Sequence, residues 1–145
     1  VIRIRTDKPD YSNIPYKAFD WFYTCYHGAI ECVPHDAPTP RGNSVITTSY
    51  VDANLFHDLI SGRSVTGILH LLNLTPIDWY SKLQTTVETA TFGSEYVAAR
   101  TCTNQIIDLR LTLRYLGVPI DGPSFMFGDN ESVVNTAAII LNSKE

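Results

Sequence analysis

The sequence predicts a mixed α/β domain in which three antiparallel strands are followed by a helix, a fourth strand and a second helix. Two observations favour this class. Short runs rich in β-branched and aromatic residues follow one another closely after residue 44. A longer stretch then carries apolar residues at intervals of four and three, as an amphipathic helix does. Elements of both kinds within 145 residues indicate one mixed sheet with helices packed on it.

The three strands are expected within residues 45–83. The runs are 45–52 (VITTSYVD), 65–73 (VTGILHLLN) and 77–83 (IDWYSKL), with a turn at 61–64 (SGRS). Their connections are short, which is typical of an antiparallel meander. The first strand is expected to end in a carboxylate, that of Asp52.

The long helix is predicted from mostly apolar residues, spaced four and three apart, that would form a stripe along one helix face. Its members are Glu95, Ala99, Cys102, Ile106, Leu109, Leu113 and Leu116. Gly117 and then Pro119 predict where the helix stops. Glu95 begins an otherwise apolar stripe, so its carboxylate is expected to point toward the sheet that the stripe covers.

The fourth strand is expected at 124–129 (SFMFGD), again ending in a carboxylate, and the second helix follows to about residue 141. A strand reached by a crossover lies parallel to the first strand, so Asp52 and Asp129 are expected at one sheet edge with Glu95 between them. Three converging carboxylates repel one another, and a divalent cation removes that cost. The alternative is structural, because an aspartate at a strand end and a glutamate in a first helical turn are common.

Residues 1–43 differ from residues 44–145. They hold five of the eight prolines, Pro9, Pro15, Pro34, Pro38 and Pro40, together with many aromatic residues. No helical or alternating period persists there. We expect an irregular connection segment that packs on the following domain, with a boundary at the turn-forming residues 38–43.

Composition narrows the possible functions. The net charge of −4 argues against binding nucleic acid through bulk positive charge, but not against a nuclease that uses metal ions. No apolar run approaches the ~20 residues of a membrane helix, so no membrane partner is expected. Three cysteines cannot form a full disulfide framework and favour an intracellular protein. The chain starts without Met and is expected to be part of a longer protein.

Six blocks between residues 38 and 135 resemble the ribonuclease H domain of copia-type retrotransposon polyproteins. They are 50–54 (YVDAN), 62–67 (GRSVTG), 76–88 (PIDWYSKLQTTVE), 91–98 (TFGSEYVA), 116–123 (LGVPIDGP) and 127–133 (FGDNESV). Their order and spacing cover about two-thirds of the chain. The region before residue 43 is similar to the segment that joins reverse transcriptase to ribonuclease H in these elements.

The resemblance implies a ribonuclease H-like fold in which Asp52, Glu95 and Asp129 are the catalytic, metal-binding acids. Its cofactor is Mg²⁺, with Mn²⁺ as a substitute. Its substrate is the RNA strand of an RNA–DNA hybrid, its partner the reverse transcriptase domain of the same polyprotein, and its location a cytoplasmic particle or the nucleus. Ser64, Gln84 and Asn130 are candidate nucleic-acid contacts, with a cap or turn role as the alternative for each.

At its C-terminal end, the chain differs from the ribonuclease H family that it resembles. Ribonuclease H enzymes carry a fourth acid on a later element, and Glu145 does not match it in position. We therefore expect residues 44–145 to be a ribonuclease H-like domain that lacks its C-terminal part. The alternative function is a non-catalytic relic of such a domain that acts as a scaffold or protein-interaction module.

Overall fold

The computed structural model describes residues 3–12, 33 and 35–142. Its elements in chain order are β1 (Thr47–Asp58), β2 (Arg63–Leu72), β3 (Thr75–Leu83), α2 (Thr91–Tyr115), β4 (Phe125–Phe127) and α3 (Glu131–Asn142). The predicted mixed α/β class and the predicted order of elements are confirmed. The architecture is compatible with a ribonuclease H-like fold.

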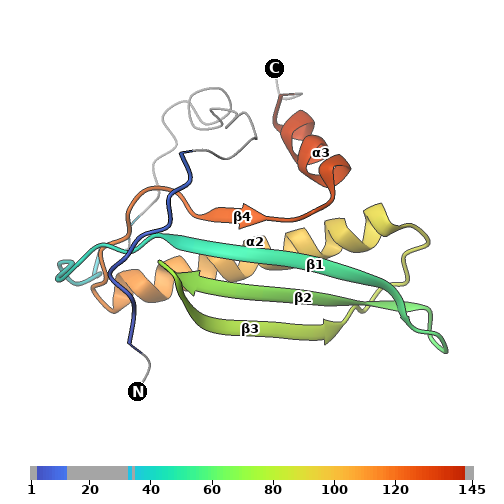
Figure 1. Ribbon diagram of the computed structural model, residues 1–145, viewed down its shortest axis with the longest axis horizontal. Coiled ribbons are helices and arrows are strands. Elements are labelled where there is room, and N and C mark those ends of the chain that lie inside the picture. The colour runs from blue at the N-terminus through green and yellow to red at the C-terminus, as the bar shows by residue number, and fades with distance from the viewer. Residues whose placement is uncertain (1–2, 13–32, 34, 143–145) are drawn as a thin grey trace.

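The four strands form one sheet in the order β3-β2-β1-β4 (Figure 1). β1 pairs antiparallel with β2, and β2 pairs antiparallel with β3. β4 pairs with β1 in parallel, as the crossover through α2 requires. The sheet is therefore mixed, with β1 at its centre between an antiparallel and a parallel neighbour.

The end of the first strand differs from the prediction. β1 continues to Asp58, so Asp52 lies inside the strand and not at its end. The reason is visible in the alternation of burial, because Val51 and Ala53 are buried while Asp52 and Asn54 are exposed. Pairing with β2 is regular as far as Asn54 and then shifts register before the turn to Arg63.

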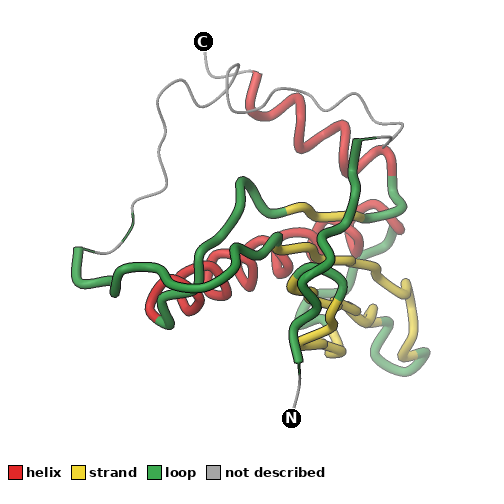
Figure 2. Tube along the Cα trace, turned by 60° about the vertical axis from the view of Figure 1, so that its left-hand side comes forward, coloured by secondary structure: helices red, strands yellow, loops and turns green. Residues whose placement is uncertain are grey.

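α2 lies along one face of the sheet and forms the core with β1 and β2 (Figure 2). One core cluster contains Val51, Ala53, Ile68, Ala98 and Cys102, and a second contains Val45, Leu72 and Leu113. The predicted stripe is thus largely confirmed, but Ala98 is fully buried where Ala99 was expected. Leu116 lies beyond the last turn as the C-cap and is 71% exposed.

The predicted stop at Gly117 is confirmed. Gly117 has φ +70°, a left-handed conformation that glycine adopts without steric cost. Its N–H donates to the carbonyl of Arg114, and the N–H of Val118 donates to that of Leu113. α3 then extends away from the sheet in Figures 1 and 2, with Val133 buried and Val134 exposed.

Residues 3–12 cross one end of the sheet. The N–H of Arg5 donates to Thr75 Oγ1, and Lys8 forms an ion pair with Asp121 at 2.6 Å. Tyr11 packs against Phe125 at a ring-centroid distance of 4.4 Å and hydrogen-bonds Thr48. The expected packing of the aromatic N-terminal segment on the domain is confirmed for Tyr11, while the other expected aromatic residues, at 16–26, lie outside the described residues.

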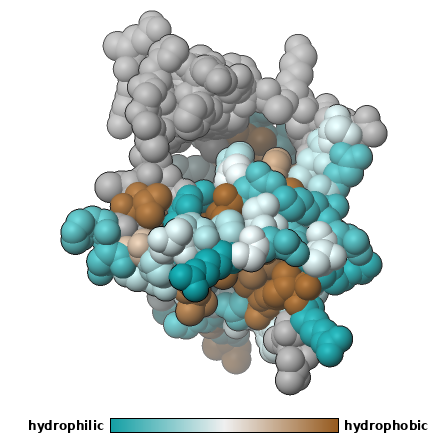
Figure 3. All heavy atoms as spheres, turned by 90° about the vertical axis from the view of Figure 1, so that its left-hand side faces the viewer, coloured by the Kyte–Doolittle hydropathy of each residue, from teal (hydrophilic) through white to brown (hydrophobic). Residues whose placement is uncertain are grey.

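The surface at this end of the molecule is mainly hydrophilic, with separate apolar patches (Figure 3). Within the described part of the chain, no helix combines the length and apolar character that crossing a membrane requires. The division of the chain at residue 43 stays a prediction.

Candidate functional site

Three carboxylates from three different elements come together at one place. Asp52 lies on β1, Glu95 on α2, and Asp129 in the loop between β4 and α3. Each offers one oxygen atom, and these atoms all lie within 4.8 Å of one another. The predicted convergence is therefore present, and we call Asp52, Glu95 and Asp129 the acidic cluster.

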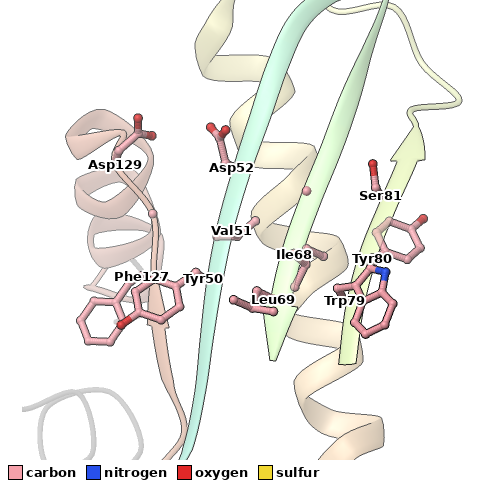
Figure 4. Close-up of a pocket in the computed structure, with 12 residues that line it drawn as sticks. Tyr50, Val51, Asp52, Ile68, Leu69, Trp79, Tyr80, Ser81, Phe127 and Asp129 are labelled. Carbon is pink, nitrogen blue, oxygen red and sulfur yellow. The ribbon is translucent and has the colours of Figure 1, made fainter. Parts of the chain in front are cut away.

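The parallel pairing of β1 and β4 aligns the two aspartates. Tyr50 is the register partner of Phe127, where β4 ends. Two residues further along each chain are Asp52 and Asp129, so the two carboxylates arrive at the same level from neighbouring segments. Figure 4 shows them side by side, above the stacked rings of Tyr50 and Phe127.

Glu95 reaches the same place from the helix. It lies in the second turn of α2 and is only 6% exposed. The backbone N–H of Ala53 donates to its carboxylate. β4 pairs with β1 only as far as Tyr50, so this N–H lies past the end of that ladder, and the side chain of Glu95 takes the place of a strand partner.

The electrostatics of the acidic cluster are unfavourable without a cation. The pKa of Glu95 is raised from its usual 4.5 to about 7. Burial is the main cause, the N–H of Ala53 opposes the rise, and the negative charges of Asp52 and Asp129 add to it. Asp52 and Asp129 are themselves exposed. The arrangement therefore joins one buried carboxylate to two that solvent and ligands can reach.

An open groove of about 590 Å³ adjoins the acidic cluster (Figure 4). Asp52 and Asp129 lie at one end of it, and Trp79 on β3 lies at the other. Its walls are mostly apolar side chains of Tyr50, Leu69 and Phe127 on the sheet face. The acidic cluster is thus open to a ligand much larger than a single ion.

The three candidate nucleic-acid contacts have structural partners in the folded chain. The side chains of Ser64 and Gln84 are buried, so they present no surface on which nucleic acid can lie. Asn130 is partly exposed, and its Oδ1 accepts a hydrogen bond from the N–H of Val133 at 3.2 Å. That bond makes Asn130 a cap of α3, which is the structural role given above as its alternative.

Sequence reasoning missed the backbone N–H of Ala53. Every residue except proline has a backbone N–H, so the residue type does not show which one is free to bind a side chain. That depends on how the strands are paired. Reasoning from the sequence also missed that Gln84 hydrogen-bonds the residue before Glu95. Gln84 belongs to one of the quoted sequence blocks, but the sequence does not show that its partner is the carbonyl of Ser94.

Fold and site together define a mixed α/β domain in which three carboxylates converge beside β1, just past the end of its pairing with β4. The chain is 35% identical over 77 residues to the retrovirus-related Pol polyprotein from transposon TNT 1-94 of Nicotiana tabacum. The match spans 53% of this chain and 6% of the tobacco polyprotein. No protein-family model and no solved structure matches the chain. The similarity relates the chain to a retrotransposon polyprotein.

Proposed function

We propose that the chain is a metal-dependent nuclease domain that cleaves the RNA strand of RNA–DNA hybrids within a retrotransposon polyprotein. The observation that carries the proposal is the acidic cluster, whose oxygen atoms lie within 4.8 Å of one another although their residues are far apart in sequence. A structural role alone gives no reason to bring one buried and two exposed carboxylates together, because their mutual repulsion opposes folding.

The donor set fits Mg²⁺, with Mn²⁺ as a substitute. All three side chains offer carboxylate oxygen, which is the ligand type that these hard cations prefer. Asp52, Glu95 and Asp129 would hold the metal. When bound, Mg²⁺ lowers the pKa of an attacking water and stabilises the leaving 3′ oxygen of the scissile phosphodiester.

The residues of the chain have separate tasks in this proposal. The exposed carboxylates of Asp52 and Asp129 face the solvent side, where a phosphate can approach. The buried carboxylate of Glu95 is oriented by the N–H of Ala53 and supplies the third ligand of the acidic cluster. Because β1 and β4 are paired backbone to backbone, the separation of the two aspartates is set before any ligand binds.

The substrate class rests on two kinds of support. The six sequence blocks resemble ribonuclease H domains, and the curated relative is a retrovirus-related Pol polyprotein. An RNA–DNA hybrid is then told from DNA by its 2′-hydroxyl groups. We propose the reverse transcriptase domain of the same polyprotein as the partner, and a cytoplasmic particle or the nucleus as the location.

The test is cleavage of an end-labelled RNA–DNA hybrid by the full chain in Mg²⁺ and in EDTA. We expect Mg²⁺-dependent cleavage of the RNA strand that leaves 5′-phosphate and 3′-hydroxyl ends, and its loss in Asp129→Asn. Asp108→Asn is the matched control, because Asp108 is an exposed aspartate of α2 outside the acidic cluster. Cleavage that survives Asp129→Asn would overturn the assignment of the site.

A second function, a non-catalytic scaffold or interaction module, is favoured by the charge of the domain. After Ser44 the chain has six basic and ten acidic residues, which opposes binding of a polyanion. Among the described residues the cluster also holds three acids and not four. Metal binding by the wild-type chain without cleavage of any hybrid would favour this function over the nuclease.

A further inference from the structure

The helix that carries Glu95 begins without a side-chain cap. Its N-cap is Ala90, which makes no side-chain hydrogen bond, and its first turn has no acidic residue. A helix end without a capping side chain frays more easily, because its first N–H groups have no partner within the helix. Glu95 follows only four residues after the start of α2, so its carboxylate depends on whatever else holds this turn.

Gln84, directly after β3, supplies that support. One hydrogen bond runs from its Nε2 to the carbonyl oxygen of Ser94 at 2.9 Å, and another from the same atom to Thr66 Oγ1 at 3.0 Å. The backbone N–H of Gln84 donates to the carbonyl of Ser64 at 2.7 Å. The side chain is 5% exposed and links both β2 and the end of β3 to the residue that precedes Glu95.

Stability gives a weak reason for a glutamine at this position. Its Oε1 is buried without a hydrogen-bond partner, and so is the Oγ of Ser64. A buried acceptor without a partner opposes folding, whereas an apolar side chain of the same length avoids that cost. The benefit of the amide is therefore the pair of bonds that its nitrogen donates.

We propose that Gln84 is a positioning residue that holds the first turns of α2 so that the carboxylate of Glu95 stays within the acidic cluster. The inference rests on the proposed metal-dependent function and adds a residue that touches neither metal nor substrate. It assigns to Gln84 a different role from direct contact with nucleic acid. The link runs from Gln84 through the carbonyl of Ser94 to the backbone of Glu95.

The decisive variant is Gln84→Met, which keeps length and removes the donor. Gln105→Met is the matched control, because Gln105 also joins α2 to the sheet, through His70 at 3.0 Å, but lies ten residues beyond Glu95. Both variants lose one glutamine contact between α2 and the sheet region. Only the first loses the contact beside Glu95.

The measurements are Mn²⁺ affinity by calorimetry and the kinetics of hybrid cleavage, made on the full chain. We expect Gln84→Met to weaken Mn²⁺ binding and lower kcat by about 10- to 100-fold, the range seen when partners of metal ligands are removed, with KM for the hybrid unchanged. Gln105→Met should leave both quantities near the wild-type values. Thr66→Val, which removes one acceptor of Gln84, should give a smaller loss in the same direction.

Four results would overturn the inference. Folded Gln84→Met that binds Mn²⁺ and cleaves like the wild type refutes it while leaving the proposed function intact. Equal losses in Gln84→Met and Gln105→Met indicate a general structural role. If Gln84→Met does not fold, an unchanged Mn²⁺ affinity in Thr66→Val refutes it. A wild-type chain that binds no Mn²⁺ overturns the proposed function and this inference with it.

Discussion

Two polar clusters lie beside α2, and they are built in opposite ways. The first, which we call the His70 cluster, consists of Ser49, His70 and Gln105. His70 Nδ1 lies 2.7 Å from Ser49 Oγ, and His70 Nε2 lies 3.0 Å from Gln105 Oε1. Both ring nitrogens have partners, and the ring is 3% exposed. The second is the acidic cluster, in which three carboxylates face one another.

The difference separates a structural polar group from the site that we propose to be functional. In the His70 cluster, each ring nitrogen that is removed from water gains a hydrogen bond, so burial is compensated. In the acidic cluster, Glu95 is buried with one N–H donor and lies beside two like charges, and burial together with these charges raises its pKa to about 7. An arrangement that opposes folding and opens to solvent indicates a site for a ligand of opposite charge.

The largest expected effect is that of Glu95→Gln on cleavage. The substitution keeps the shape and an acceptor for the N–H of Ala53 but removes a charge that would hold the metal. We expect kcat for hybrid cleavage to fall by at least about 10²- to 10³-fold, the scale of losing one group that stabilises developing charge. Thermal unfolding in EDTA should show that the variant is no less stable than the wild type at pH 8.

His70→Ala should show the reverse pattern. It removes two hydrogen bonds and leaves a cavity, so the free energy of unfolding should fall by about 2–4 kcal/mol. Urea denaturation measures this loss. Cleavage per folded molecule should stay within about twofold of the wild type, because His70 lies outside the acidic cluster. A large fall in kcat with unchanged stability would erase the distinction between the two clusters.

The pH dependence of stability gives a smaller effect with a definite sign. The pKa of Glu95 is raised from 4.5 to about 7 on folding, so protonation favours the folded state. The contribution to stability is fully present below pH 4.5 and is lost as the pH rises through 7. In EDTA, the wild type should lose on the order of 2 kcal/mol relative to Glu95→Gln across this range, after allowing for solvent screening. Parallel profiles of the two proteins would contradict the raised pKa.

Asn130→Ala tests the smallest effect. The Oδ1 of Asn130 accepts the N–H of Val133 and so caps α3 directly after Asp129. Its loss should cost about 1 kcal/mol of the free energy of unfolding, as for other N-caps. Asn130→Asp is the control that keeps an acceptor and should retain most of this stability. If both variants instead weaken binding of the hybrid equally at unchanged stability, Asn130 is a nucleic-acid contact and not only a cap.

The sequence predicted much of the acidic cluster, for reasons that can be named. The helical period placed Glu95 on the face toward the sheet, and the crossover placed Asp129 next to Asp52. The end of β1 was predicted wrongly, because the alternation of buried and exposed residues continues through Ala53 and Asn54 while the prediction stopped at the first carboxylate. The bond from the N–H of Ala53 and the bond from Gln84 to Ser94 depend on tertiary register, which residue types do not encode.

The most direct test of the central claim is calorimetric titration of MnCl₂ into the full chain at neutral pH. We predict saturable binding to the wild type and to Asp108→Asn. Asp52→Asn, Glu95→Gln and Asp129→Asn should each bind at least about tenfold more weakly, because each removes one ligand of a shared site. Equal Mn²⁺ affinity in all five proteins, or no saturable binding to the wild type, would contradict the claim that these carboxylates form a metal site.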